Sequence, residues 1–113
     1  MSITRIEAGP RMSQAVVHGD TVYLAGQVGT GSTVAEQTQA VLEQIDGLLA
    51  RAGTDKSKLL SATIWLTDIG TFDEMNRVWE AWVSPGNTPA RATVEAKLAA
   101  PQYRVEIGVV AAR

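Results

Sequence analysis

The sequence contains no cysteine and a single histidine among its 113 residues. Without cysteine the chain has no disulfide framework, no thiolate nucleophile and no zinc site built on cysteine. His18 adjoins a predicted turn and has no acidic companion at a metal-ligand spacing, so we expect a surface histidine. Gly26, Gly29 and Gly31 do not have the order of a dinucleotide-binding loop, and no P-loop lysine follows them. These absences predict a protein that needs neither a metal ion nor an organic cofactor.

The chain also lacks an excess of charge of either sign and a long apolar run. Ten basic and twelve acidic residues give a formal net charge of −2. A nucleic acid or an anionic membrane demands a concentrated positive field, so we expect neither as a partner. No segment approaches the ~20 apolar residues of a membrane helix, and residues 1–7 lack the apolar run of a signal peptide. With 45% hydrophobic residues, the composition predicts one soluble, cytoplasmic domain spanning residues 1–113.

Hydrophobic periodicity indicates three strands, a helix, a strand, a second helix and two final strands. Alternation of apolar and polar residues predicts the first four strands at 3–7, 15–18, 21–28 and 59–66. Residues 18–20 fit a tight hairpin turn. Apolar residues at helical intervals follow Thr33 and Thr71, and each threonine precedes a glutamate by three residues, the spacing of a capping box. Gly53 and residues 84–86 are expected to end the two helices.

The two final strands carry charge inside an apolar frame. Residues 88–98 and residues 103–110 each alternate apolar with mostly polar side chains, which predicts an apolar face and a charged face on each strand. We expect these strands to pair as a hairpin through residues 99–102. Arg91 and Glu106, held on rigid strands, are suited to binding a small carboxylate and orienting a water molecule.

The element order βββαβαββ predicts an α+β fold in which two amphipathic helices cover one face of one sheet. Ser61, Thr63 and Trp65 are expected on the other face, and a half-apolar open face on so small a domain favours a subunit interface. In the expected hairpin Glu106 stands opposite Glu95, which places Arg91 roughly 13 Å away at ~3.3 Å per residue. That separation favours a site formed by two chains.

Six short motifs are spread over nearly the whole chain. They are residues 13–16 (SQAV), 24–28 (LAGQV), 37–38 (QT), 75–79 (MNRVW), 89–95 (PARATVE) and 105–107 (VEI). With these motifs the chain resembles the reactive intermediate deaminase family, also called the Rid, YjgF-type or L-PSP endoribonuclease-type family. The last two motifs, at their correct spacing, are the specific ones.

The resemblance implies a chorismate-mutase-like fold and a homotrimer whose three sheets form a central barrel with the helices outside. Ligand sites are then expected in the clefts between adjacent subunits. The best-known activity of the family is the hydrolysis of enamines and imines, such as 2-aminoacrylate, to 2-oxo acids and ammonia. The implied partners are therefore a small carboxylate-bearing imine, enamine or 2-oxo acid and two further copies of the chain.

The family's functional positions match individual residues of this sequence. Arg91 corresponds to the arginine that binds the substrate carboxylate, and Glu106 to the glutamate that positions the water. Thr93 corresponds to the position whose backbone carbonyl faces the imine nitrogen. Gly26 corresponds to a backbone contact to the carboxylate region, and Asn76 to a polar helix residue near the cleft.

Two positions depart from the deaminase pattern. Met12 stands where the deaminase archetypes carry a tyrosine, and Ala25 replaces a serine in the third strand. The site therefore keeps its charged pair and loses two hydroxyl contacts. Met12 is expected to line the cleft as an apolar wall.

Each charged residue also has a structural interpretation. Arg91 can pair with a carboxylate at an interface, and Arg104 and Lys97 can neutralise Glu106 on a solvated face. Glu95 is interpreted as a structural partner rather than as a catalyst.

Three functions are compatible with these residues. The first is a trimeric imine and enamine deaminase that uses Arg91 and Glu106. The second is a non-catalytic trimer that binds a small 2-oxo acid or a related metabolite in the same cleft, and Met12 and Ala25 favour it. The third is an endoribonuclease, which rests on a family label and is opposed by the charge balance and the single histidine.

Overall fold

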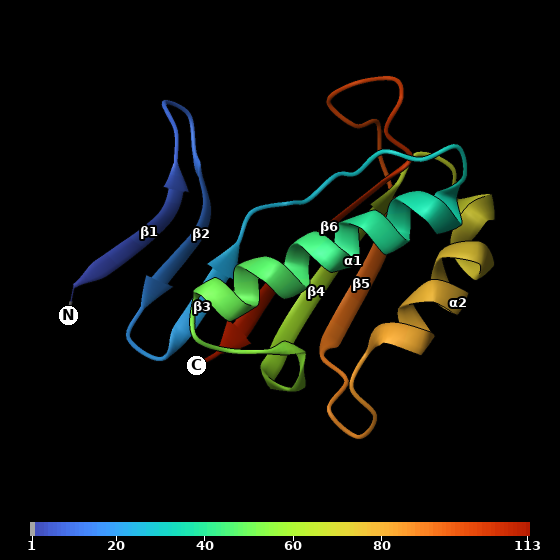
Figure 1. Ribbon diagram of the computed structural model, residues 1–113. Coiled ribbons are helices and arrows are strands. Elements are labelled where there is room, and N and C mark those ends of the chain that lie inside the picture. The colour runs from blue at the N-terminus through green and yellow to red at the C-terminus, as the bar shows by residue number, and fades with distance from the viewer. Residues whose placement is uncertain (1) are drawn as a thin grey trace.

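The computed structural model describes residues 2–113, and it confirms the expected order of elements. Six strands form one sheet, and two helices lie on one face of it (Figure 1). The strands are β1 (Ile3–Ala8), β2 (Ser13–His18), β3 (Thr21–Leu24), β4 (Leu59–Leu66), β5 (Ala90–Glu95) and β6 (Val105–Ala112). The helices are α1 (Val34–Arg51) and α2 (Phe72–Trp82). No helix of the described residues has both the length and the apolar character that a membrane crossing requires.

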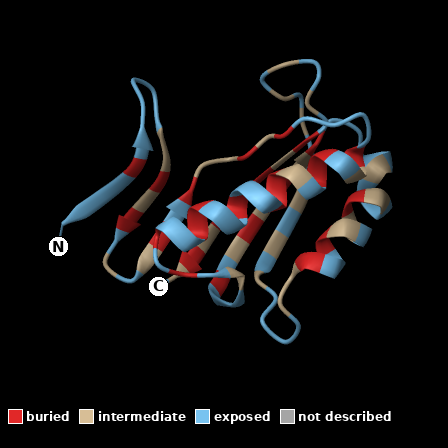
Figure 2. Ribbon diagram, in the orientation of Figure 1, coloured by how far each residue is buried: buried red, intermediate tan, exposed pale blue. Residues whose placement is uncertain are grey.

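The hydrophobic core lies between the helices and the sheet. Leu42 and Ile45 of α1 are fully buried, as are Ile64 of β4 and Ile107 of β6. Figure 2 shows the buried residues on the sides of α1 and α2 that face the sheet and along its central strands. Because β4 and β6 alternate buried with partly exposed residues, the opposite sheet face stays partly open, as the periodicity predicts.

The two C-terminal strands do not form the expected hairpin. The sheet order is β1-β2-β3-β6-β4-β5, so β4 separates β5 from β6. β5 runs parallel to β4, whereas β6 runs antiparallel to β3 and β4. The physical reason is that β4, α2 and β5 form a crossover unit, in which the helix lets the second strand return parallel to the first. The register with Glu106 opposite Glu95 is therefore wrong, because Glu106 pairs with Trp65 and Glu95 with Leu66.

The N-terminal strands agree better with the periodicity. A two-residue turn joins β2 to β3, and its Gly19 has a φ of 61°, which favours glycine. The third strand is shorter than expected, since β3 ends at Leu24 rather than at residue 28. Ala25 still donates from its N–H to the Gln14 carbonyl at 2.9 Å, but Gln27 exchanges backbone hydrogen bonds with β6. Residues 26–28 therefore leave β2 while they stay beside β6.

One of the two expected capping boxes is present. At the start of α1, the Thr33 hydroxyl accepts a hydrogen bond from the Glu36 N–H at 3.1 Å. At the start of α2, Thr71 makes no such bond. The Glu74 carboxylate instead accepts from the Ala35 N–H at 2.8 Å, in the first turn of α1. Glu74 thus satisfies a free amide of the other helix and joins the two helices, which a local pattern cannot reveal.

Gln37 holds three separate segments together with one side chain. The residue is 1% exposed. Its Nε2 donates to the Gly31 carbonyl at 3.1 Å and to the Gln102 carbonyl at 2.9 Å, and its Oε1 accepts from the Arg104 N–H at 2.8 Å. The amide therefore fixes the chain just before β6, the strand that carries Glu106.

We predict that Gln37→Met lowers the free energy of unfolding by about 2 kcal/mol, because a shape-matched apolar side chain leaves three backbone groups unpartnered. Gln39→Met on the exposed side of the same helix is the control and should change it by less than about 0.5 kcal/mol. Urea denaturation at one protein concentration measures both. Equal effects of the two substitutions would show that the Gln37 amide is not a structural clamp.

Candidate functional site

The predicted site residues fall on opposite faces of the sheet. Arg91 of β5 pairs with Ala62 of β4, which is buried beneath the helices. Glu106 of β6 pairs with Trp65, which alternates with the buried Ile64 and therefore projects to the open face. Two strand spacings and three residues separate the two backbone positions, which amounts to roughly 14 Å. One chain therefore does not bring Arg91 and Glu106 to the same small ligand.

Arg91 lies among side chains of α2. Its Nη1 donates to the Asn76 Oδ1 at 2.7 Å. The guanidinium carbon also lies 5.6 Å from the ring centre of Phe72 and 5.4 Å from that of Trp79, within the range of cation–π attraction. Partial burial lowers the pKa of Arg91, and the charge of Glu80 opposes this change. The guanidinium stays charged, is held in one place and keeps further N–H donors for a carboxylate.

Thr93 lies two residues further along the same face of β5. The Ala96 N–H donates to the Leu66 carbonyl of β4 at 2.9 Å. Since backbone groups alternate in direction along a strand, Thr93 turns its own N–H and C=O away from β4, toward the unpaired edge of the sheet. Its side-chain hydroxyl is buried and has no hydrogen-bond partner within residues 2–113. Within residues 2–113 this carbonyl beside Arg91 is left free to accept a hydrogen bond from an N–H of a bound ligand.

Glu106 lies against the backbone of Gly26. A Cβ built on residue 26 would stand 2.9 Å from the carboxyl carbon of Glu106, which shows that only glycine leaves room for this carboxylate. The ion pair found among residues 2–113 joins Arg51 to Glu7, so neither Arg104 nor Lys97 neutralises Glu106 within this part of the chain. The Glu106 carboxylate is therefore available to a water molecule.

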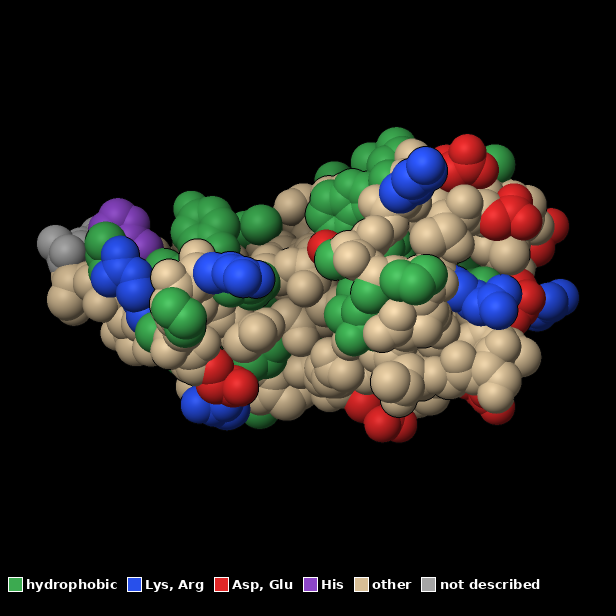
Figure 3. Space-filling model, turned by 90° about the horizontal axis from the view of Figure 1, so that it is seen from above, with side chains coloured by type: hydrophobic (Ala, Val, Ile, Leu, Met, Phe, Trp, Pro, Cys, Tyr) green, Lys and Arg blue, Asp and Glu red, His purple; other side chains and the backbone are tan. Residues whose placement is uncertain are grey.

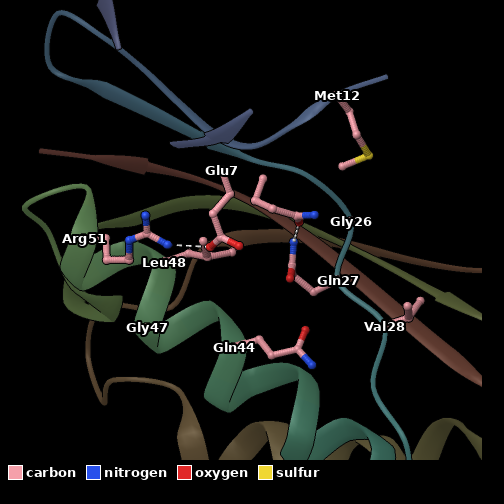
Figure 4. Close-up of a pocket in the computed structure, with 10 residues that line it drawn as sticks. Glu7, Met12, Gly26, Gln27, Val28, Gln44, Gly47, Leu48 and Arg51 are labelled. Atoms are coloured by element: carbon pink, nitrogen blue, oxygen red, sulfur yellow. Dashed lines mark hydrogen bonds and ion pairs between the residues drawn. The ribbon is translucent and has the colours of Figure 1, made fainter. Parts of the chain in front are cut away.

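Met12 is 49% exposed and lies in the connection between β1 and β2. Together with Gly26 it lines a pocket of about 610 Å³, whose floor is α1 (Figure 4). Gly26 thus lies between Met12, with which it shares this pocket, and the side chain of Glu106 on its other side. The structure brings Met12, Gly26 and Glu106 into one group and Asn76, Arg91 and Thr93 into another.

Glu95 has a structural contact of its own. Its Oε1 accepts a hydrogen bond from the Ile69 N–H at 3.0 Å, at the turn that precedes α2. Among residues 2–113, no three acidic or histidine side chains gather closely enough to hold a metal ion.

Sequence reasoning missed the aromatic surroundings of Arg91. The apolar pattern that follows Thr71 predicts a helix and gives Phe72 and Trp79 no role beyond packing. Phe72, Asn76 and Trp79 are nevertheless spaced by four and three residues and so share one face of α2. That spacing, with an amide between two aromatic residues, is the signal that would have indicated a binding surface for a guanidinium.

The whole described chain, residues 2–113, matches the family model described as endoribonuclease L-PSP. A RutC family protein from Haemophilus ducreyi is 46% identical over 112 residues, which cover 97% of this chain and 96% of that protein. A 2-iminobutanoate/2-iminopropanoate deaminase from Rattus norvegicus is 31% identical over 107 residues, which cover 88% of this chain and 77% of that protein. The crystal structure of a member of the YjgF protein family from Neisseria meningitidis superimposes with a TM-score of 0.99 at 50% identity, covering 100% of this chain and 96% of that one.

We predict that Gly26→Ala displaces the Glu106 carboxylate by roughly 1 Å or more, because the added Cβ would overlap the end of that side chain. The overlap is with a flexible side chain, so the melting temperature should fall by only a few degrees, about 1 kcal/mol. Crystal structures and thermal denaturation measure the two effects. Gly108→Ala is the matched control, since its Cβ would meet Trp65 at an ordinary 3.6 Å. An unmoved Glu106 in Gly26→Ala would contradict this account of the contact.

Proposed function

Because the chain belongs to the endoribonuclease L-PSP family, which is also the Rid or YjgF family, we propose that it hydrolyses reactive imines and enamines of the 2-aminoacrylate type. The products are 2-oxo acids and ammonia. The observation that carries this proposal is the fixed guanidinium of Arg91, bonded to Asn76 and packed against two aromatic rings beside an unpaired strand edge.

Each site is formed by two chains of a homotrimer. Arg91 and Glu106 lie on opposite faces of the sheet, so a cleft that contains both requires Arg91 from one subunit and Glu106 from its neighbour. Large apolar side chains support such an association: Tyr23, Leu60 and Val94 are about half exposed, at 48%, 52% and 45%. Exposed residues of this size on sheet strands favour contact with another copy.

In the proposed reaction Arg91 binds the substrate carboxylate through two parallel hydrogen bonds, and the Thr93 carbonyl accepts from the imine N–H. Glu106 takes one proton from a water molecule as the water oxygen bonds to the imine carbon, and it passes that proton to the nitrogen. The carbinolamine then loses ammonia as its hydroxyl proton moves to nitrogen and the carbon–nitrogen bond breaks. An enamine enters this sequence after protonation of its terminal carbon. Positioning supplies most of the acceleration, since the substrate is already reactive.

The second candidate is a non-catalytic trimer that binds a small 2-oxo acid in the same cleft. The exposed thioether of Met12 favours it, because an apolar wall binds a ligand without contributing to proton transfer. An endoribonuclease is the weakest candidate. On the side of the molecule shown in Figure 3, basic and acidic side chains are spread among one another and form no continuous basic surface.

We predict that the wild-type protein accelerates the release of 2-oxo acid from imines, and that Arg91→Ala lowers kcat/KM by roughly 100-fold or more, because the carboxylate is no longer held. An amino-acid oxidase generates the imines, and trapping with semicarbazide reports their lifetime. Arg77→Ala, an exposed arginine of α2, is the control and should keep wild-type activity.

Absence of acceleration by folded wild-type protein would contradict the deaminase proposal. Binding of 2-oxobutanoate to that same protein, abolished by Arg91→Ala, would then establish the non-catalytic function.

A further inference from the structure

The groove of about 610 Å³ lies between α1 and the connection that joins β1 to β2 (Figure 4). It includes Gly26 and Met12, but Glu106 does not line it. Gln27 pairs with the buried Ile107, so the side chain of Gln27 faces the helices, whereas that of Glu106, the neighbour of Ile107, faces away from them. The groove and the Glu106 carboxylate are therefore on opposite sides of the sheet, and the groove is a separate site.

A buried amide directs an unpartnered oxygen into this groove. Gln27 is 7% exposed, and its Nε2 donates to the Gln14 Oε1 at 2.9 Å and to the Ala25 carbonyl at 3.1 Å. Within residues 2–113 these are the hydrogen bonds of its side chain, so its Oε1 has no donor. This oxygen is not sealed from solvent, because the sealed side-chain atom without a partner in these residues is the Thr93 hydroxyl. The free acceptor of Gln27 therefore opens into the groove, toward α1 (Figure 4).

Gln14 and Gln44 add two further amides to the lining. Gln14 uses its oxygen as the acceptor for Gln27, so the N–H groups of its own Nε2 have no partner among residues 2–113. Gln44 extends into the groove from the opposite wall, which is α1 (Figure 4). The groove thus presents both a hydrogen-bond acceptor and hydrogen-bond donors, all from side chains that carry no charge.

The charged side chains of the groove are already paired with each other. The Arg51 Nη1 lies 2.5 Å from the Glu7 Oε2, so an ionised ligand meets no unpaired charge here. Burying an ionised group without such a partner is unfavourable. The lining therefore favours a ligand that is polar and uncharged.

The rest of the lining is apolar, and a glycine in the middle of a helix leaves space above it. Met12, Val28 and Leu48 line the groove from three different segments. Gly47 lies within α1, and a Cβ built on it meets no atom within 4 Å. Glycine is less favourable than alanine inside a helix, and neither a close approach nor a positive φ explains it at this position. The space over Gly47 accommodates the apolar body of a ligand.

We infer that this groove binds an uncharged small molecule that carries a carboxamide or lactam group on an apolar body. The N–H of the ligand donates to the Gln27 Oε1, and its C=O accepts from the Gln14 Nε2. The apolar body lies over Gly47 against Leu48. A ligand of this kind supplies the donor that the buried Gln27 oxygen lacks, and a pocket of ~300–1,000 Å³ is the usual size for a small-molecule site. The inference goes beyond the proposed function, because it requires neither Arg91 nor Glu106.

Three probes of nearly equal shape test the inference. They are 3-phenylpropanamide, 4-phenyl-2-butanone, in which a methyl group replaces the amide nitrogen, and 3-phenylpropanoate, in which the group is ionised. For the wild-type protein, calorimetric titration should give a Kd for the amide that is roughly tenfold or more below those of the ketone and the carboxylate. Equal affinities for the amide and the ketone, or no binding of the amide to folded protein, would overturn the inference.

Substitutions in the groove locate the bound amide. Gly47→Leu fills the space over the helix and should raise the Kd of the amide by about tenfold or more. Ala50→Leu adds the same side chain at an exposed position of α1 outside the groove and should leave the Kd unchanged. Unchanged binding in Gly47→Leu would place the probe elsewhere and overturn the assignment.

Gln14→Leu provides a second variant, whose readout is the preference for amide over ketone. Removing the donor should bring the two Kd values within about threefold of each other, whereas a purely structural change would weaken both probes alike and would contradict the assigned hydrogen bond. Arg91→Ala should bind the amide as the wild-type protein does. Loss of amide binding in Arg91→Ala would show that the probe occupies the proposed imine cleft, which would overturn the inference of a separate site.

Discussion

The alternation of side chains between the two faces of one sheet is the constraint on which this structure's function depends. β4 lies between β5 and β6, and the three strands align so that Arg91 faces the helices whereas Glu106 faces away from them. No rotamer change brings the two groups together, because roughly 14 Å and the sheet itself separate them. The two halves of the proposed chemistry are therefore complete only where two chains meet.

The Arg91 half and the Glu106 half of the proposed site are each held in place by different contacts. Asn76, Phe72 and Trp79 of α2 hold Arg91, so the position of the guanidinium follows the position of that helix. On the other side, Gly26 leaves room for Glu106, and the buried amide of Gln37 fixes the loop that leads into β6. A polar network that is fully satisfied specifies one arrangement of the chain, and a site divided between subunits requires such precision from both.

Local patterns in the sequence predicted what local forces determine. The periodicity identified both α-helices and all six strands, and the Thr33 cap and the turn at Gly19 follow from the chemistry of neighbouring residues. Strand pairing is not local, and the expected hairpin failed because α2 returns β5 to the far side of β4. The capping box expected from Glu74 at the start of α2 is absent for the same reason, because the Glu74 carboxylate accepts its hydrogen bond from the first turn of α1.

The most direct test of the account is complementation between two inactive variants. Arg91→Ala and Glu106→Gln are each expected to lose imine hydrolysis, and co-expression under two affinity tags allows mixed trimers to be isolated. If Arg91 and Glu106 act from neighbouring subunits, every mixed trimer regains one intact cleft, and a random equimolar mixture recovers roughly a quarter of wild-type activity. Mixed trimers that are verified by native mass spectrometry, yet no more active than either parent, would contradict a site shared between chains.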